Sequence, residues 1–362
     1  MALLMSFRRY WAVFFFSVLV LPTIGFFAPD LPAPLRTVAA PAESWWLRAS
    51  ERLDPYINNV FGFRGAVLAA HDRYVRWLGV DGERVMKGEG GALFIKDQQA
   101  VEQSIGQLVR PWVVEQVADV ATRLDRYMKS IGGRFVTVVP PNGQTVNWDR
   151  LPAYARDLRR SPTEYDLLAK TMAARGIPFV DLRPVMAEAR KDGPVYRLND
   201  THWNDRGAVL GFNATMDALG RPDLAFNPAD VLGPPRERFD GDLVRLMGAT
   251  KAEVPDVDYP RKGAMVRRED LTPIPDIATQ RSPKDPFQPQ VYETGHAGPR
   301  IMVIGDSFTQ SFWPGLLAAR ASAYMWTHHR SCGFDMQEVE RFKPDILIYA
   351  PAERSLPCRA EK

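Results

Sequence analysis

Two short motifs contain the side chains that nucleophilic catalysis requires. The first is Asp-Thr-His-Trp at residues 200–203, and the second is Gly-Asp-Ser-Phe at residues 305–308. A serine hydroxyl is a weak nucleophile until a base accepts its proton, and a carboxylate must hold that base in the correct tautomer. Asp200 is close enough in the chain to reach Nδ1 of His202. The motifs therefore predict a catalytic triad of Ser307, His202 and Asp200.

Each motif also has a plainer explanation when it is taken alone. A Gly-Asp-Ser tripeptide is found where it only caps a helix, and one of five histidines can be ordinary surface or core filler. The two motifs are more informative together, because each is expected at the end of a strand and the start of a helix. The backbone N–H of Ser307 and the helix N-terminus that follows it would stabilise an oxyanion.

Five apolar segments that alternate with helical patterns predict the scaffold. Helical spacing over 111–130, a capping box at 161–164 and a helix start at 204 or 205 lie between them. Strands separated by helices indicate an α/β protein with a doubly wound parallel sheet, which binds ligands at the carboxyl ends of its strands. The predicted strands cover 134–139, 177–181, 300–304, 323–327 and 345–350.

Residues 221–300 interrupt this alternation. They contain 12 of the 30 prolines and show little periodicity. We interpret them as an insertion that leaves the sheet and forms a lid or a flap over the substrate cleft. A disordered insertion is the alternative.

The N-terminus predicts export. Residues 10–28 are 19 consecutive residues without a charge, enough to span a bilayer core of roughly 30 Å. Arg8 and Arg9 precede this run and would stay in the cytoplasm. We therefore expect a signal anchor over 1–30, a Pro-rich tether over 31–60 and a catalytic domain over 61–362. The alternative is a cleaved signal peptide with a processing site at residues 38–40, which would leave a soluble periplasmic protein.

Composition excludes some classes of protein. The 362 residues are 46% apolar and 25% charged, as in a folded globular protein. A net charge of +3, without a zinc-finger or RNA-binding signature, gives no reason to expect a nucleic-acid partner. His328, His329 and Cys332 have no fourth ligand at a plausible spacing, so we expect no metal site. Cys332 and Cys358 are the only cysteines; after export they can form a disulfide or remain two buried thiols.

The motifs together resemble the alginate O-acetyltransferase branch (the AlgJ and AlgX type) of the SGNH-hydrolase superfamily, over most of residues 55–358. The order of the serine and Asp/His blocks is reversed relative to ordinary SGNH hydrolases, so the resemblance implies a circularly permuted fold. The segments that resemble the family are Phe61-Gly-Phe-Arg64, 88–94, Val139-Pro-Pro-Asn142, 200–203, Gly241-Asp-Leu243, 305–308 and Glu353-Arg354.

The resemblance also implies a function. It implies an O-acetyltransferase that modifies an exported polysaccharide through an acyl-serine, needs no cofactor, and works with a membrane-bound O-acyltransferase that supplies acetyl groups and with other export proteins. The asparagine that usually donates to the oxyanion is missing from residues 350–354. Arg354 and the N–H of Gly333 are the replacement candidates, and a structural ion pair between Arg354 and Glu353 is the alternative for Arg354. Asn142 is expected to line the cleft or to form a turn.

Other assignments stay open at this stage. A polysaccharide acetylesterase would use the same triad, and a non-catalytic scaffold of an export complex is a third possibility. Three tryptophans are expected to pack in the core, with stacking on sugar rings as the alternative: Trp203, Trp313 and Trp326. Basic residues of the insertion would suit a uronate polymer, with an ordinary solvated surface as the default: Arg236, Arg238, Lys251, Arg261, Lys262, Arg267 and Arg268.

Overall fold

The computed structural model describes residues 10, 13–17, 84–262, 270–279 and 281–358. The chain divides into two compact units, Met1–Gly82 with Lys362, and Glu83–Glu361. In the first unit only residue 10 and a short helical segment at 13–17 are described. The second unit contains both sequence motifs, at 200–203 and 305–308.

A seven-stranded sheet forms the centre of the second unit, in the order β4-β3-β11-β9-β10-β8-β7. Five strands are parallel neighbours, and their positions match the five predicted segments. They are β3 (Arg134–Val139), β4 (Phe179–Asp181), β9 (Arg300–Gly305), β10 (Ala323–His328) and β11 (Ile346–Ala350).

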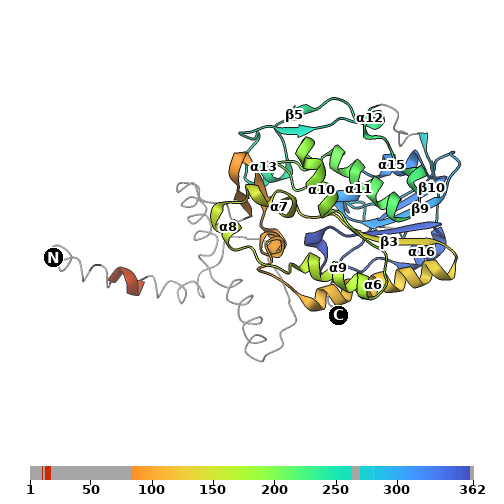
Figure 1. The fold of residues 1–362 in the computed structure, drawn as a ribbon, viewed down its shortest axis with the longest axis horizontal. Helices are drawn as coiled ribbons and strands as arrows, with labels where there is room; N and C mark the ends of the chain where they lie inside the picture. Colours follow the sequence, from red (N-terminus) through yellow and green to blue (C-terminus); the bar gives the residue numbers. More distant parts are fainter. Residues whose placement is uncertain (1–9, 11–12, 18–83, 263–269, 280, 359–362) are drawn as a thin grey trace. The chain divides into compact units, whose positions relative to one another are not determined.

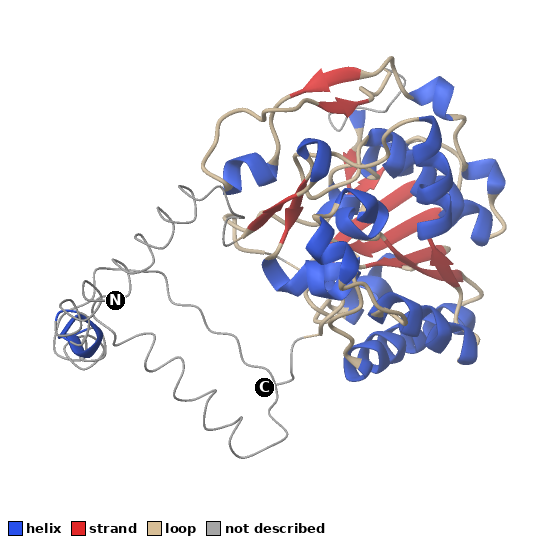
Figure 2. Cartoon of the chain, turned by 60° about the vertical axis from the view of Figure 1, so that its left-hand side comes forward, coloured by secondary structure: helices blue, strands red, loops and turns tan. Residues whose placement is uncertain are grey.

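Helices cover both faces of this sheet, as Figures 1 and 2 show. Alternate residues of the strands point into two separate cores, because successive side chains of a strand face opposite sides. Val303 and Ile348 pack with α10 (Arg183–Ala189), α11 (Asp205–Ala218) and α15 (Pro314–Ala318). Met302 and Leu347 pack with α6 (Pro111–Ser130), α9 (Glu164–Ala174) and α16 (Met336–Phe342). The architecture is therefore doubly wound.

The strand order agrees with the predicted permutation. Counted from β9, the parallel strands run β9, β10, β11, β3 and β4 along the permuted chain, and they lie in the sheet as 2-1-3-4-5. That is the order of the flavodoxin-like doubly wound sheet, in which ligands bind where the direction of winding reverses, between the first and third strands. Here the reversal lies between β9 and β11. Ser307 follows β9 directly.

The prediction of an all-parallel sheet was wrong at one edge. β8 (Gln290–Glu293) pairs antiparallel with β10, and β7 (Thr272–Pro273) pairs antiparallel with β8, so the sheet is mixed. Proline is tolerated in β7 because an edge strand has N–H groups that need no ladder partner.

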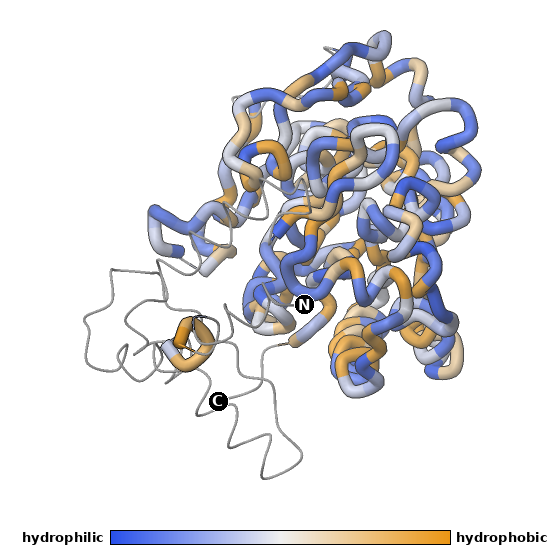
Figure 3. The backbone as a smooth tube through the Cα atoms, turned by 90° about the vertical axis from the view of Figure 1, so that its left-hand side faces the viewer, coloured by the Kyte–Doolittle hydropathy of each residue, from blue (hydrophilic) through white to orange (hydrophobic). Residues whose placement is uncertain are grey.

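The insertion at 221–300 is therefore only partly an excursion, since β7 and β8 belong to it. It also contains α12 (Pro228–Val231), α13 (Asp242–Leu246) and a two-stranded antiparallel sheet of β5 (Arg236–Arg238) and β6 (Asp256–Asp258). Figure 3 shows that this small sheet is largely hydrophilic.

The remaining elements are short. They are β1 (Val85–Lys87) paired with β2 (Leu93–Ile95), α5 (Ala100–Ser104), α7 (Gly143–Val146), α8 (Ala153–Asp157), α14 (Ser307–Gln310) and the 3-10 turns η1 (Glu89–Gly91), η2 (Asp97–Gln99), η3 (Trp148–Arg150), η4 (Arg190–Asp192), η5 (Pro222–Leu224) and η7 (Glu353–Ser355).

Several predicted features lie outside the described residues. These are most of the anchor at 1–30, the tether at 31–60, the segment 61–64 and the domain start at residue 61. Among the residues that are described, no helix combines the length and the apolar character that crossing a bilayer demands.

The two cysteines form a disulfide, with their Cα atoms 5.0 Å apart. Because it closes a loop of 26 residues, we expect the double substitution of Cys332 and Cys358 by serine to lower the free energy of unfolding by about 3–4 kcal/mol. Chemical denaturation of both proteins, with and without a reductant, measures this. Reductant should destabilise only the unsubstituted protein. A change below about 1 kcal/mol would contradict the expectation.

Candidate active site

The turn that follows β9 presents Ser307 at the carboxyl edge of the sheet. Gly305 ends the strand, and a Cβ there would come within 2.2 Å of Thr309 Oγ1, so only glycine fits. Asp306 caps α14 by accepting from the N–H of Phe308 at 3.0 Å, and its other oxygen accepts from the N–H of Ala352 at 2.8 Å. The buried Asp306 carboxylate thus ties the serine turn to the segment after β11.

The structure brings Ser307, His202 and Asp200 together. Nε2 of His202 lies 2.9 Å from Oγ of Ser307, and Nδ1 of His202 lies 2.6 Å from Oδ1 of Asp200. The same carboxylate oxygen accepts from the N–H of His202 at 3.1 Å. The imidazole is packed against Phe308, with ring centroids 5.0 Å apart. Both imidazole nitrogens therefore have the neighbours that proton transfer from the serine requires.

Asp200 is held in its charged form. Burial disfavours the charge, but the hydrogen bond and charge of His202, the charge of Arg197 and the N–H of Asp242 together bring the pKa of Asp200 well below its usual value. The N–H of Asp242 reaches Oδ2 of Asp200 at 3.1 Å. A carboxylate with this pKa remains ionised throughout the neutral range, so it can stabilise an imidazolium.

Asp242 is a functional neighbour that the sequence reasoning did not identify. Its carboxylate accepts from both the N–H of Thr201, at 2.8 Å, and the hydroxyl of Thr201, at 2.5 Å. It thereby holds the backbone at Thr201, which lies between Asp200 and His202 in the chain. The only signal in the sequence was Gly-Asp at 241–242. These residues contribute to the family resemblance, but the sequence alone gave them no role.

A second acid of the insertion supports the same loop. Asp256 is buried and accepts from the N–H of Asn199 at 3.1 Å. Burial raises its pKa to about 6. Gly241 approaches so closely that a Cβ would lie 1.9 Å from the carbonyl oxygen of Asn199. The insertion, which we expected to form a lid or flap, therefore supports the loop that carries Asp200.

Asp200, His202 and Asp242 also place ligand atoms within 4.8 Å of one another, an arrangement that can bind a metal ion. In the structure the Asp200 carboxylate instead accepts hydrogen bonds from His202 and from the N–H of Asp242, and the Asp242 carboxylate accepts from Thr201. A cation would have to replace these bonds. The hydrogen-bonded arrangement is the one that a triad needs.

Arg354 lies beside the triad. Its Nη2 donates to Oγ1 of Thr201 at 3.4 Å, and its guanidinium lies 5.0 Å from the ring centroid of Phe308. Nη1 is buried and has no acceptor among the described residues. The expected alternative, an ion pair with Glu353, is not formed, because Glu353 binds Asn142 and Thr145 instead. Arg354 is therefore a cation with an unused donor beside Thr201 and Phe308, which adjoin His202 and Ser307 in the chain.

The other two predicted residues do not meet Ser307 among the contacts of the described chain. The N–H of Gly333 donates to the carbonyl of Arg330 at 3.1 Å and closes a turn, so it is not free to bind an oxyanion. Asn142 is fully buried, and its Nδ2 donates to Oγ of Ser104 at 3.0 Å. Asn142 lies at the N-terminus of α7 and has a structural contact with Glu353, which corresponds to the turn-forming alternative.

The tryptophans and the histidine pair have packing roles. All three tryptophans are buried and donate within the protein: Trp203 to Phe308, Trp313 to Ala208 and Trp326 to Thr309. Cys332 is in the disulfide, so it cannot join His328 and His329 as a thiolate ligand.

Glu353, the residue before Arg354 in the chain, has a buried carboxyl group. Burial raises its pKa to about 7, although the N–H of Asn142 and the hydroxyl of Thr145 both donate to Oε2 at 2.7 Å. Oε1 is buried with no hydrogen-bond partner among the described residues. Glu353 therefore keeps its proton in the folded protein at pH values at which the unfolded chain has already lost it.

This shift predicts a pH-dependent stability. Because the folded pKa exceeds the unfolded one, the carboxyl costs stability progressively as pH rises from about 4.5 to 7, by about 3 kcal/mol in total. Glu353→Gln should abolish that loss, since the amide oxygen can keep both hydrogen bonds. Unfolding by urea at pH 5 and pH 8 measures it, with the exposed Glu237→Gln as the control. Equal pH dependence in Glu353→Gln and the unsubstituted protein would refute it.

The large cavities lie away from the triad. Two of them, of about 800 and 950 Å³, are lined by other residues, and the crevice at Asp200 and Thr201 has a volume of about 10 Å³.

No curated protein matches the sequence. PatB1 of Bacillus cereus has a similar fold, with a TM-score of 0.51 and 15% identity over 76% of this chain and 97% of PatB1. The O-acetyltransferase domain of Pseudomonas putida AlgJ matches with a TM-score of 0.44 and 17% identity, over 76% of this chain and 93% of that domain.

The family comparison extends over most of the described unit. The model of the SGNH hydrolase-like domain of the acetyltransferase AlgX matches residues 85–333. This range is more than half of the 362 residues and includes both motifs, at 200–203 and 305–308. The chain therefore belongs to the AlgX-type family of SGNH hydrolase-like acetyltransferases.

Proposed function

We propose that this protein transfers acetyl groups to hydroxyls of an exported polysaccharide through an acyl-enzyme on Ser307. The family membership supports acyltransferase activity toward polysaccharides in general. The observation that carries the finer proposal is the 2.9 Å contact between His202 Nε2 and Ser307 Oγ, with Asp200 on the other side of the imidazole.

In the first step His202 takes the proton of Ser307 as Oγ attacks the carbonyl carbon of an acetyl donor. The N–H of Ser307, which has no acceptor among the described residues, and the guanidinium of Arg354 stabilise the oxyanion. The carbonyl reforms, the donor's leaving group departs with the proton from His202, and acetyl-Ser307 remains.

In the second step a sugar hydroxyl gives its proton to His202 and attacks the acetyl carbon. The bond to Ser307 breaks, and Ser307 recovers a proton from His202. The chemistry uses no cofactor. If water replaces the sugar, the same residues produce acetate, so the fate of the acetyl group separates a transferase from an esterase.

Trapping the acyl-enzyme tests this proposal. PatB1 has been solved with a sulfonyl adduct, so a sulfonyl fluoride is a suitable probe for the full chain. We expect the sulfonyl group, and acetyl from an activated ester, on Ser307 by peptide mass spectrometry, and acetyl on an added oligosaccharide. Labelling elsewhere would refute the nucleophile. Release of acetate alone, with no acetylated sugar, would favour the esterase.

Arg354 should act on the rate and not on protein folding. We expect Arg354→Gln to lower kcat by about 10²-fold, because one oxyanion donor is lost, while KM and the unfolding temperature change little. Arg354→Lys should recover only part of the rate, since an ammonium lacks the planar fork of donors. The exposed Arg126→Gln, on α6, is the control. A change in KM with constant kcat would assign Arg354 to substrate binding instead.

For the cellular context, we propose that the catalytic unit works in the periplasm. The apolar run at 10–28 would hold it to the inner membrane, near a membrane-bound O-acyltransferase that supplies acetyl groups. Determination of the mature N-terminus in membrane and soluble fractions tests the anchor. A mature protein that begins after residue 40 and is recovered in the soluble fraction would show that the segment is a cleaved signal peptide.

A further inference from the structure

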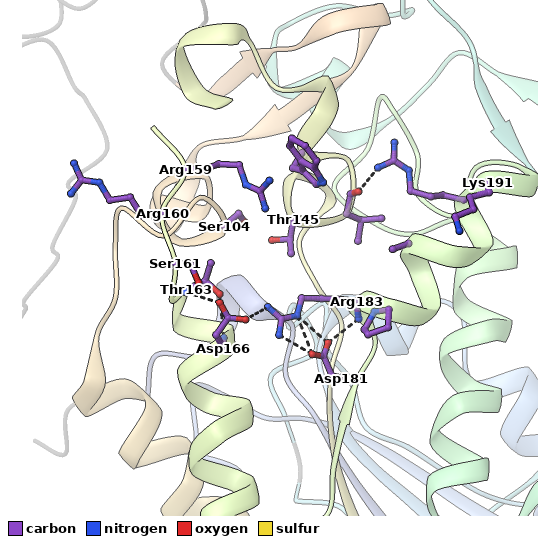
Figure 4. Close-up of a pocket in the computed structure, with 15 residues that line it drawn as sticks. Ser104, Thr145, Arg159, Arg160, Ser161, Thr163, Asp166, Asp181, Arg183 and Lys191 are labelled. Atoms are coloured by element: carbon purple, nitrogen blue, oxygen red, sulfur yellow. Dashed lines mark hydrogen bonds and ion pairs between the residues drawn. The ribbon is translucent and has the colours of Figure 1, made fainter. Parts of the chain in front are cut away.

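A cavity of about 800 Å³ lies between α7, the connection from α8 to α9, and α10 (Figure 4). Its volume is in the range of small-molecule sites, about 300–1,000 Å³. Ser307 and His202 do not line it. The proposed mechanism leaves this cavity unused.

Most cations at its wall are already neutralised. Arg183 pairs with Asp166 at 2.6 Å and with Asp181 at 2.7 Å, and Arg190 pairs with Asp149 at 2.6 Å. Arg159 is exposed and has no carboxylate partner among the described residues, and in Figure 4 it points into the cavity, whereas Arg160 points away. The cavity therefore presents a single unpaired inward guanidinium beside fixed polar groups.

The surroundings of Arg159 suit a sugar. Its guanidinium lies 4.2 Å from the ring centroid of Trp148, which is 42% exposed and also lines the cavity. Four residues with hydroxyl groups line the wall: Ser104, Thr145, Ser161 and Thr163. Ser104 accepts from Asn142 at 3.0 Å, so its own proton is available, and Thr145 donates to Glu353 at 2.7 Å, so its oxygen can still accept. The aromatic ring can pack against an apolar face of a pyranose. The hydroxyl that donates and the hydroxyl that accepts can bind the hydroxyls of the sugar.

We propose that this cavity is a binding site for a saccharide residue that carries one carboxylate. Arg159 would hold the carboxylate in a planar, bidentate pair. Trp148 would pack against the ring, and Ser104 and Thr145 would bind its hydroxyls. A single unpaired guanidinium favours a monocarboxylate over a dense polyanion.

The cavity is separated from the triad by one short helix. Thr145 and Val146 of α7 line the cavity, whereas Gly143 and Gln144 of the same helix line the crevice at Asp200. If the protein acetylates a polysaccharide as proposed above, this site would anchor the acceptor at a distance from the residue that is modified. That part of the inference rests on the proposed function, but the binding itself does not.

Calorimetric titration of the full chain carrying Ser307→Ala tests the site without turnover. The probes are a galacturonate tetrasaccharide, the same tetrasaccharide with its carboxylates reduced to alcohols, and inorganic phosphate. We expect the uronate probe to bind best, and Arg159→Gln to weaken it about ten- to a hundred-fold. Trp148→Ala should weaken both sugars. Arg126→Gln, an exposed arginine of α6, is the matched control and should leave binding unchanged.

Three results would overturn the inference. They are no binding of the uronate probe, binding that Arg159→Gln leaves unchanged, and binding of phosphate as tight as that of the uronate, which would indicate a simple anion site. Acetyl transfer is measured in parallel on the chain with Ser307 intact. Transfer without uronate binding refutes the inference alone, and binding without transfer refutes the proposed function alone.

Discussion

Ser307→Ala is expected to lower acetyl transfer by about four to six orders of magnitude, because no acyl-enzyme can form. The substitution removes one hydrogen bond, to His202, so the free energy of unfolding should change by only about 1 kcal/mol. Transfer of labelled acetyl to an oligosaccharide measures the rate, and polymer secretion by cells that express the variant measures the remaining function.

The control is Ser311→Ala, an exposed serine one turn further along the chain. It should retain full activity. If Ser307→Ala cells fail to secrete polymer while the residual polymer is still acetylated, the protein is a scaffold of the export machinery. Undiminished transfer by the purified variant would also refute the proposed nucleophile.

Asp200→Asn is expected to lower kcat by about 10³- to 10⁴-fold. In the protein, Nδ1 of His202 points at Oδ1 of Asp200 at 2.6 Å, so the carboxylate selects the tautomer whose Nε2 is free to accept a proton. An amide nitrogen in that position would favour the opposite tautomer, with the proton on Nε2. The serine would then lack a base.

The same substitution should cost some stability, about 1–3 kcal/mol, because the amide cannot accept from both His202 and Asp242 as the carboxylate does. Steady-state kinetics and thermal unfolding separate the two effects. Asp217→Asn, on the exposed side of α11, controls for the loss of one negative charge. A decrease in kcat of less than tenfold would contradict the role of Asp200.

Acid should not titrate Asp200 in the working range. The pKa of Asp200 is lower in the folded protein than in the unfolded chain, so its charge stabilises the fold at every pH above the unfolded pKa of about 3.9. This stabilisation is lost only as the pH falls through the pKa of the folded protein. An acidic limb of the rate profile between pH 5 and 8 therefore belongs to another group.

The local patterns in the sequence were sufficient to predict the parallel strands and the contact between Ser307 and His202. Strands β3, β9, β10 and β11 are buried apolar segments, and such segments are recognisable without knowledge of their partners. β4 begins two residues later than predicted, at Phe179, after Pro178, whose missing N–H disfavours a ladder position.

What could not be predicted depends on contacts between distant segments. β7 and β8 are short and Pro-flanked. β8 becomes a strand by pairing with the edge of β10, and β7 then pairs with β8. Asp242 and Asp256 look like ordinary surface acids in the sequence, yet they bind a backbone more than 40 residues away. Gly333 was an oxyanion-donor candidate only because of its position in the chain. Its N–H instead donates to the carbonyl of Arg330 and closes a turn.

The disulfide has a consequence for Arg354 beyond stability. The segment that carries Arg354 is fixed at one end by β11, which ends at Ala350, and at the other by the bond from Cys358 to Cys332. A segment of eight residues that is tethered at both ends has few conformations, so its guanidinium is preorganised before substrate arrives. Under the proposed function, oxidation of the thiols, which is favoured outside the reducing cytoplasm, would thus fix the position of an oxyanion donor.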